Sequence, residues 1–116
     1  MPTFALNFYN PAVADQLRSS RKTATIRLGD KSAKYKKGMI VTVLCGSRFG
    51  IRERVFDAVI DKVEVKRLAD LSPREIEHDN PELRRTDELA HFLSQLYNRE
   101  VTEDDIVTVI RFSQIA

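Results

Sequence analysis

Strand-like segments follow one another along the chain instead of alternating with helices, and this order limits the folds open to it. Three of them cover residues 23–28, 39–46 and 54–65, and the polar segments between them contain Gly29 and Gly50. Strict alternation of strands and helices would predict a doubly wound parallel sheet. Clustered strands instead favour an α+β chain whose sheet is mostly antiparallel.

Two further strands are expected at the ends of the chain. Residues 4–8 carry apolar side chains at every second position, and residues 106–112 are apolar and β-branched. Within 54–65, strict alternation puts the odd-numbered side chains on one face and the even-numbered ones on the other. A sheet of five such strands can close into a small barrel, which hides its edges.

Local signals predict helices between these strands. Asn10 followed by Pro11 is a helix-start signal for residues 11–19. Ser72 and Glu75 match a capping box, so a short helix is expected before Asn80 and Pro81 end it. Residues 86–97 place apolar side chains at i, i+3, i+4 and i+7, the spacing of an amphipathic helix. We therefore expect two to three helices flanking the barrel.

Composition indicates one domain covering residues 1–116. The chain is 42% hydrophobic and 31% charged, which provides one core and leaves no repeat or linker. Its single cysteine, Cys45, cannot form an internal disulfide, and its place in a buried strand favours a core residue over a nucleophile. No signal-peptide pattern and no long apolar run is present, so we expect a cytoplasmic protein without a membrane partner.

Charge is divided unequally along the chain. Residues 1–67 contain fourteen Lys and Arg against six Asp and Glu, whereas residues 68–116 contain five against eleven. The excess is densest in a basic group made up of Arg18, Arg21, Lys22, Arg27, Lys31, Lys34, Lys36 and Lys37. Such a group suits a polyanion, because each neutralised phosphate releases counterions. A solvated surface without a partner is the plainer interpretation, and the acidic half could instead complement a second copy, so both monomer and dimer stay open.

The segment 21–27 joins the first helix to the second strand and has the chemistry of a reactive or anion-binding site. It combines three cations with the hydroxyls of Thr23 and Thr25. A threonine can act as a nucleophile if a base removes its proton, and a lysine can serve as that base only when burial lowers its pKa. Lys22 and Thr25 are three residues apart, so they can meet only if Lys22 precedes the strand.

An acidic segment follows the capping box. Glu75, Glu77, His78 and Asp79 could be read as metal ligands, but their spacing scatters them around a helix axis. The sequence therefore predicts no metal site. It also contains neither a P-loop nor a dinucleotide-binding glycine pattern, and no cofactor is expected.

Several segments together resemble the ASCH (activating signal cointegrator homology) domain family. They are residues 21–27, residues 35–39 before the next strand, residues 65–71 before the acidic helix, and residues 107–112 at the end. The resemblance extends over nearly the whole chain. It implies a PUA-like β-barrel related to domains that bind RNA.

Small bacterial members of this family are amidohydrolases that act on cytidine acylated at its exocyclic amine. The resemblance carries their catalytic lysine and threonine onto Lys22 and Thr25. Their glutamate falls on Asp79 in the simplest alignment, with Glu77 two residues earlier. An aspartate is one methylene shorter, so this departure weakens the hydrolase interpretation.

Three functions follow, in order of preference. The first is binding of RNA or a modified nucleoside by a basic cleft that contains Arg21, Arg27, Lys34, Lys36 and Lys37. The second is the amidohydrolase, with Lys22, Thr25 and either Asp79 or Glu77 as the catalytic set. The third is a ribonuclease or a non-catalytic interaction domain that uses the same basic surface.

Overall fold

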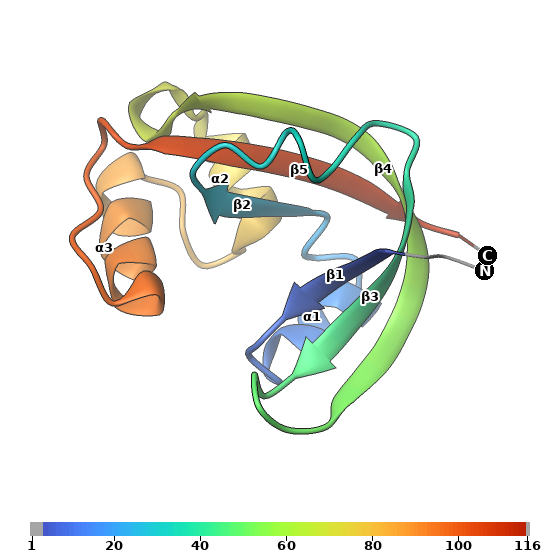
Figure 1. Cartoon of the computed structure of the whole chain (residues 1–116). Helices are drawn as coiled ribbons and strands as arrows, with labels where there is room; N and C mark the ends of the chain where they lie inside the picture. Colours follow the sequence, from blue (N-terminus) through green and yellow to red (C-terminus); the bar gives the residue numbers. More distant parts are fainter. Residues whose placement is uncertain (1–3, 116) are drawn as a thin grey trace.

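The structure, a computed structural model, describes residues 4–115 as an α+β domain, which confirms the predicted class (Figure 1). In chain order the elements are β1 (Phe4–Phe8), α1 (Val13–Arg18), β2 (Ala24–Leu28), β3 (Ile40–Gly46), β4 (Arg52–Arg67), a 3₁₀ turn (Leu68–Asp70), α2 (Pro73–Asp79), α3 (Thr86–Tyr97) and β5 (Ile106–Gln114). Within the described residues, no helix is long and apolar enough to cross a membrane.

The five strands form one curled sheet in the order β1-β3-β4-β5-β2. β1 pairs in parallel with β3, whereas the other three neighbouring pairs are antiparallel, so the sheet is mixed. The predicted closure into a barrel is wrong. Within residues 4–115, β1 and β2 do not pair and form the two open edges of a half-barrel.

The curl depends on β4, which serves both halves of the sheet. Its first half pairs with β3 and its second half pairs with β5, and Figure 1 shows it bending between them. The register shifts between Ile60 and Lys62, so a bulge at Asp61 interrupts the alternation. Strict alternation along 54–65 was therefore a wrong expectation. Val63 packs on the same core cluster as Ile60, although the two differ in parity.

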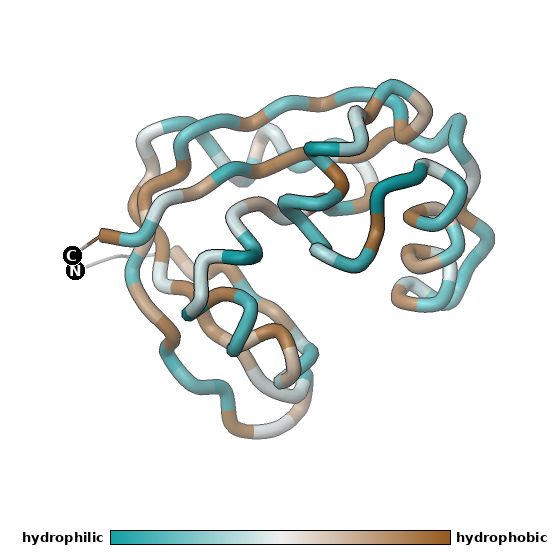
Figure 2. Tube along the Cα trace, turned by 180° about the vertical axis from the view of Figure 1, so that it is seen from behind, coloured by the Kyte–Doolittle hydropathy of each residue, from teal (hydrophilic) through white to brown (hydrophobic). Residues whose placement is uncertain are grey.

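Hydrophobic residues cover both faces of β5. Ile110 and Phe112 belong to a cluster inside the curl, with α1 and the strands β1, β3 and β4. Val107 and Val109 belong to a second cluster, in which α2 and α3 pack on the outer face. In Figure 2, the hydrophobic segments of α3 lie toward the rest of the protein, as its apolar spacing predicts.

Two helix starts show how local signals act. Ser72 and Glu75 form the predicted capping box at α2. α1 begins at Val13 instead of Pro11, because the turn before it is closed by i→i+3 bonds from the Val13 and Ala14 amides, while the Asn10 side chain caps that turn by accepting from the Ala12 amide. Cys45 is buried in β3, and burial raises the pKa of its thiol, consistent with a core residue.

Candidate nucleic-acid interface

The open edge of β2 is covered by side chains from three other places in the chain. Lys22 Nζ donates to the carbonyl of Ala24 at 3.0 Å. The Asp79 carboxylate, at the end of α2, accepts from the Ile26 amide at 3.0 Å. The Tyr97 hydroxyl, at the end of α3, accepts from the Leu28 amide at 3.3 Å. These bonds satisfy the backbone groups that an edge strand would otherwise leave unpaired.

Lys22 and Asp79 form a buried ion pair. Their Nζ and Oδ1 atoms are 2.8 Å apart, and the residues are only 5% and 7% exposed. Lys22 also donates to the Asp79 carbonyl at 2.7 Å, so each of its three N–H groups has an acceptor. Burial lowers the pKa of Lys22 below its ordinary value of 10.5, and the Asp79 carboxylate opposes that shift.

Thr25 and Arg27 lie on the inner face of β2, opposite to Ile26, which belongs to the outer cluster. Thr25 is buried and lies directly across from Ile110 of the inner cluster. Arg27 Nε donates to Thr25 Oγ1 at 3.0 Å, and its Nη2 donates to the Asn7 carbonyl at 2.8 Å. The Arg27 guanidinium thus bridges β2 and β1, the two open edges of the sheet.

The ring of Phe8 lies close to the cations of both Lys22 and Arg27. Lys22 Nζ lies 5.2 Å from the ring centroid, and the Arg27 guanidinium carbon lies 5.1 Å from it. Lys22 precedes β2, as the spacing argument required. Within residues 4–115, however, Thr25 makes no hydrogen bond to Lys22, and its hydroxyl is held by Arg27 instead.

The other predicted site residues lie apart from this pair. Glu77 is two positions from Asp79, so the helix turns it to solvent, where its carboxylate binds Arg84 Nε at 2.9 Å. Glu77 therefore lies outside the Lys22–Asp79 pair, and its place in a site stays a prediction. Arg21 is exposed and donates to Ser19 Oγ at 3.2 Å. Across residues 4–115, no three His, Cys, Asp or Glu side chains converge as a metal site would require.

The loop of residues 29–38 crosses the inner side of the sheet and presents its lysines to solvent. Tyr35 inserts into the inner cluster. The Lys31 amide donates to Thr108 Oγ1 of β5 at 2.8 Å, and the Gly38 amide donates to the Ile60 carbonyl of β4 at 2.7 Å. Gly38 has a φ of +88°, which favours glycine at this return. The exposed cations of this basic loop are Lys31, Lys34, Lys36 and Lys37.

The lysines of the basic loop differ from many other cations of the described chain in that they form no ion pair. Among the described cations from residue 21 to residue 48, only Lys22 has a carboxylate oxygen within 4 Å. Four cations of β4 do have a carboxylate oxygen within 4 Å, namely Arg54, Lys62, Lys66 and Arg67. Within the described chain, the lysines of the basic loop are therefore not tied up in ion pairs, and Asp30 is the one carboxylate that the loop itself contains.

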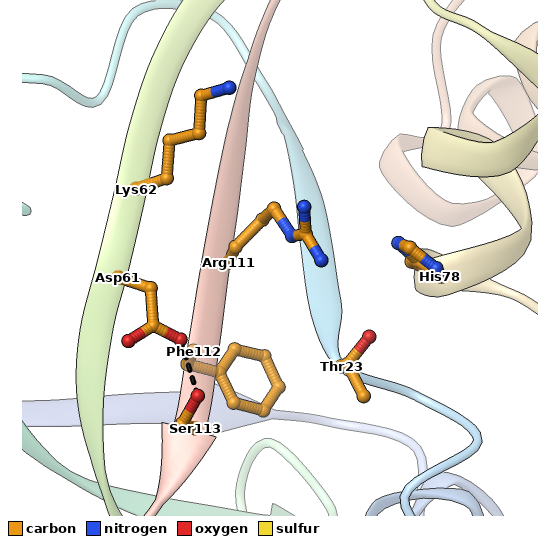
Figure 3. A pocket seen from close by; sticks show the side chains of 7 residues that line it. All are labelled: Thr23, Asp61, Lys62, His78, Arg111, Phe112 and Ser113. Atoms are coloured by element: carbon orange, nitrogen blue, oxygen red, sulfur yellow. Dashed lines mark hydrogen bonds between the residues drawn. The ribbon is translucent and has the colours of Figure 1, made fainter.

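A groove of about 540 Å³ opens on the sheet between β4, β5 and the end of α2 (Figure 3). The Arg111 guanidinium points between Thr23 and His78, while Asp61 binds Ser113. Sequence analysis did not select Arg111, although it is the one cation in an otherwise apolar closing strand. It also missed Asn7 and Phe8 as neighbours of Arg27, because strand pairing across the curl carries no local signal.

Comparison with known proteins identifies the fold. No known protein family and no curated protein matches the sequence. Among solved structures, an ASCH domain from Lactobacillus crispatus is similar with a TM-score of 0.68 and 16% identity, over 97% of this chain and 80% of that one. Protein EF3133 from Enterococcus faecalis, described with the family DUF984, gives 0.68 and 16% over 99% and 82% of the two chains. Hypothetical protein PH0355 gives 0.69 and 17% over 97% and 98%.

These likenesses show an ASCH-like fold, as the sequence segments suggested. At 16% and 17% identity they extend to the fold alone. A function for this chain has to be argued from its own residues.

Proposed function

We propose that this chain binds single-stranded RNA, or a nucleotide of it, through the cations of the basic loop and Arg27. The observation that carries the proposal is that, within the described residues, neither the exposed lysines of the loop nor the partly buried Arg27 has a carboxylate oxygen within 4 Å. Lysines that are not ion-paired are free to neutralise phosphates, and the release of counterions then favours binding. The resemblance to a family related to RNA-binding domains supports the same function.

A single strand fits this surface better than a duplex does. The lysines occupy one exposed loop, and that loop is neither a helix nor a two-stranded ribbon of the kind that enters a groove. Unpaired bases can also turn toward protein side chains, whereas a duplex presents mainly its backbone. Binding is therefore expected to depend strongly on salt and weakly on sequence.

A labelled single-stranded RNA decamer, titrated with protein at several salt concentrations, tests this function. The logarithm of the association constant should fall linearly with the logarithm of salt, with a slope of about −0.7 for each phosphate contacted. A duplex of the same length should bind more weakly. Absence of binding at low salt would refute the proposal, and shortening of the RNA on a gel would indicate a ribonuclease instead.

The buried Lys22–Asp79 pair supports hydrolysis of 4-N-acetylcytidine as a second candidate. Thr25 would attack the acyl carbonyl, cytidine would leave with its exocyclic amine protonated to NH₂, and water would then cleave the ester to release acetate. Only a neutral Lys22 has a lone pair for the threonine proton; burial favours that form by lowering the pKa of Lys22, whereas the ion pair with Asp79 favours the ammonium. The hydrogen bond of the Thr25 hydroxyl to Arg27 ranks this reaction second.

Acetate release from 4-N-acetylcytidine tests the hydrolase. Thr25→Val has nearly the same shape without the hydroxyl, and Thr25→Ser keeps a hydroxyl, so only the first variant should abolish turnover. Undiminished turnover by Thr25→Val would exclude the nucleophile role. No turnover by folded wild-type protein would exclude the reaction.

A further inference from the structure

We propose that bases of a bound single strand stack on the β3–β4 hairpin, along a strip of alternating arginine and aromatic side chains. In order of contact, this arginine–aromatic strip consists of Arg52, Tyr9, Arg48 and Phe49, and Arg27 adjoins it through Asn7. The inference rests on the RNA-binding function proposed above. It adds a contact surface that lies outside both the basic loop and the Lys22–Asp79 pair.

Guanidinium groups lie over aromatic rings along this strip. The guanidinium carbons of Arg48 and Arg52 are 5.7 Å and 5.8 Å from the Tyr9 ring centroid. Arg48 is also 5.8 Å from the centroid of Phe49. Arginine planes and aromatic rings are the two side-chain surfaces on which unpaired bases stack.

Asn7 connects the hairpin to the predicted binding residues on β2. Its backbone carbonyl accepts from Arg27 Nη2 at 2.8 Å, and its side-chain oxygen accepts from Arg52 Nη1 at 3.0 Å. Asn7 of β1 therefore holds both Arg27 of β2 and Arg52 of the hairpin. A strand bound at Arg27 can continue onto the hairpin without leaving this surface.

The hairpin tip exposes large apolar side chains on a constrained turn. Phe49 is 97% exposed and Ile51 is 91% exposed. The turn is tight: the Gly50 amide donates to the Ser47 carbonyl at 3.3 Å, and a Cβ on Gly46 would lie 2.5 Å from the Ile51 carbonyl oxygen. The turn thus holds the exposed Phe49 ring beside the Arg48 guanidinium.

Charge favours a nucleic acid over a protein as the occupant. Within residues 4–115, none of Arg27, Arg48 and Arg52 has a carboxylate oxygen within 4 Å. The acidic residue nearest in sequence, Glu53, is paired with Arg18 at 3.6 Å. Cations and rings that alternate along one surface match the phosphates and bases that alternate along a single strand.

The test compares Phe49→Ala, Phe49→Tyr and wild type in binding a single-stranded RNA decamer and the mononucleotide CMP. Loss of one stacked base should weaken decamer binding by roughly 5- to 150-fold. Phe49→Tyr keeps the ring and should bind as wild type does. CMP occupies one position only, so its affinity should not change in either variant.

Leu96→Ala, at an exposed apolar residue of α3, is the matched control and should leave binding unchanged. If wild type binds the decamer and Phe49→Ala binds it equally well, the hairpin proposal is overturned while RNA binding stands. If wild type does not bind the decamer, both fail. If Phe49→Ala alters only the sedimentation of the protein, the tip is an interface between copies and the stacking role is refuted.

Discussion

The buried edge of β2 and the exposed basic loop use lysine in opposite ways. Lys22 is 5% exposed, and each of its three N–H groups meets an acceptor within the protein. Lys36 and Lys37 are exposed and, within the described chain, have no carboxylate within 4 Å. The first lysine completes the fold, whereas the others leave their charge available to a partner.

This difference separates stability from binding. Removing one member of a buried ion pair leaves an uncompensated charge in a low-dielectric site, which is costly. Removing an exposed cation costs little, because water solvates it in both states. Variants at the two regions should therefore affect different measurements, and four predictions test that separation in decreasing order of their effect on stability.

Asp79→Ala should destabilise the fold most, by about 3–5 kcal/mol, because it leaves the Lys22 ammonium buried without its partner. It also removes the acceptor of the Ile26 amide. Urea unfolding followed by circular dichroism measures the loss. Glu77→Ala on the same helix breaks only an exposed pair with Arg84 and should cost less than about 1 kcal/mol. Equal losses in the two variants would contradict the structural role of Asp79.

Tyr97→Phe should cost about 1 kcal/mol, because the Leu28 amide at the edge of β2 loses its acceptor. The ring remains, so packing is unchanged. Tyr9→Phe serves as the control, since no hydrogen bond of the Tyr9 hydroxyl to the described chain is present. A loss in Tyr9→Phe as large as in Tyr97→Phe would show that the edge contact contributes nothing specific.

Glu75 should give stability a modest acid dependence. Burial raises the pKa of Glu75. The hydrogen bond from the Ser72 amide and the nearby Lys66 ammonium lower this pKa by more than burial raises it, so the net value lies below the ordinary 4.5. A carboxyl whose pKa is lower in the folded state stabilises above the unfolded value, and this contribution is lost as pH falls through the folded value. Thermal melts should therefore show stability declining below about pH 4.5. Glu75→Gln should flatten that decline. An unchanged profile would mean that other carboxyls cause the loss of stability at low pH.

Lys36→Ala combined with Lys37→Ala should leave stability unchanged within about 0.5 kcal/mol. Both side chains are exposed, and the loop is held by Tyr35, Thr108 and Ile60 instead. Urea unfolding beside wild type measures this. A loss comparable to that of Asp79→Ala would mean that the loop lysines are structural and would remove the contrast between the two regions.

Local sequence signals predicted the elements better than their assembly. The residues 86–97 became α3 and the capping box became α2, because apolar spacing and caps act within a few residues. Closure of the sheet was mispredicted, since pairing between β1 and β2 depends on the bend and bulge of β4, which have no local signature.

Some residues of the candidate site could likewise be predicted from the sequence, whereas others were found only from contacts in the structure. Charge density in the sequence selected the basic loop. The resemblance stated from the sequence grouped Asp79 with Lys22, and the structure places their side chains together. Only the structure shows that Glu77 pairs with Arg84 and not with Lys22. Asn7 joined the site through contacts with Arg27 and Arg52, which lie 20 and 45 positions away in the chain.

The most direct test of this account is the affinity of wild type and of the Lys36→Ala/Lys37→Ala variant for a single-stranded RNA decamer, measured across a salt series. The account predicts that the variant binds more weakly at low salt, and that the slope of log association constant against log salt becomes shallower by about 1.4 for the two lost phosphate contacts. Identical affinity and slope in the two proteins, with both fully folded, would contradict it.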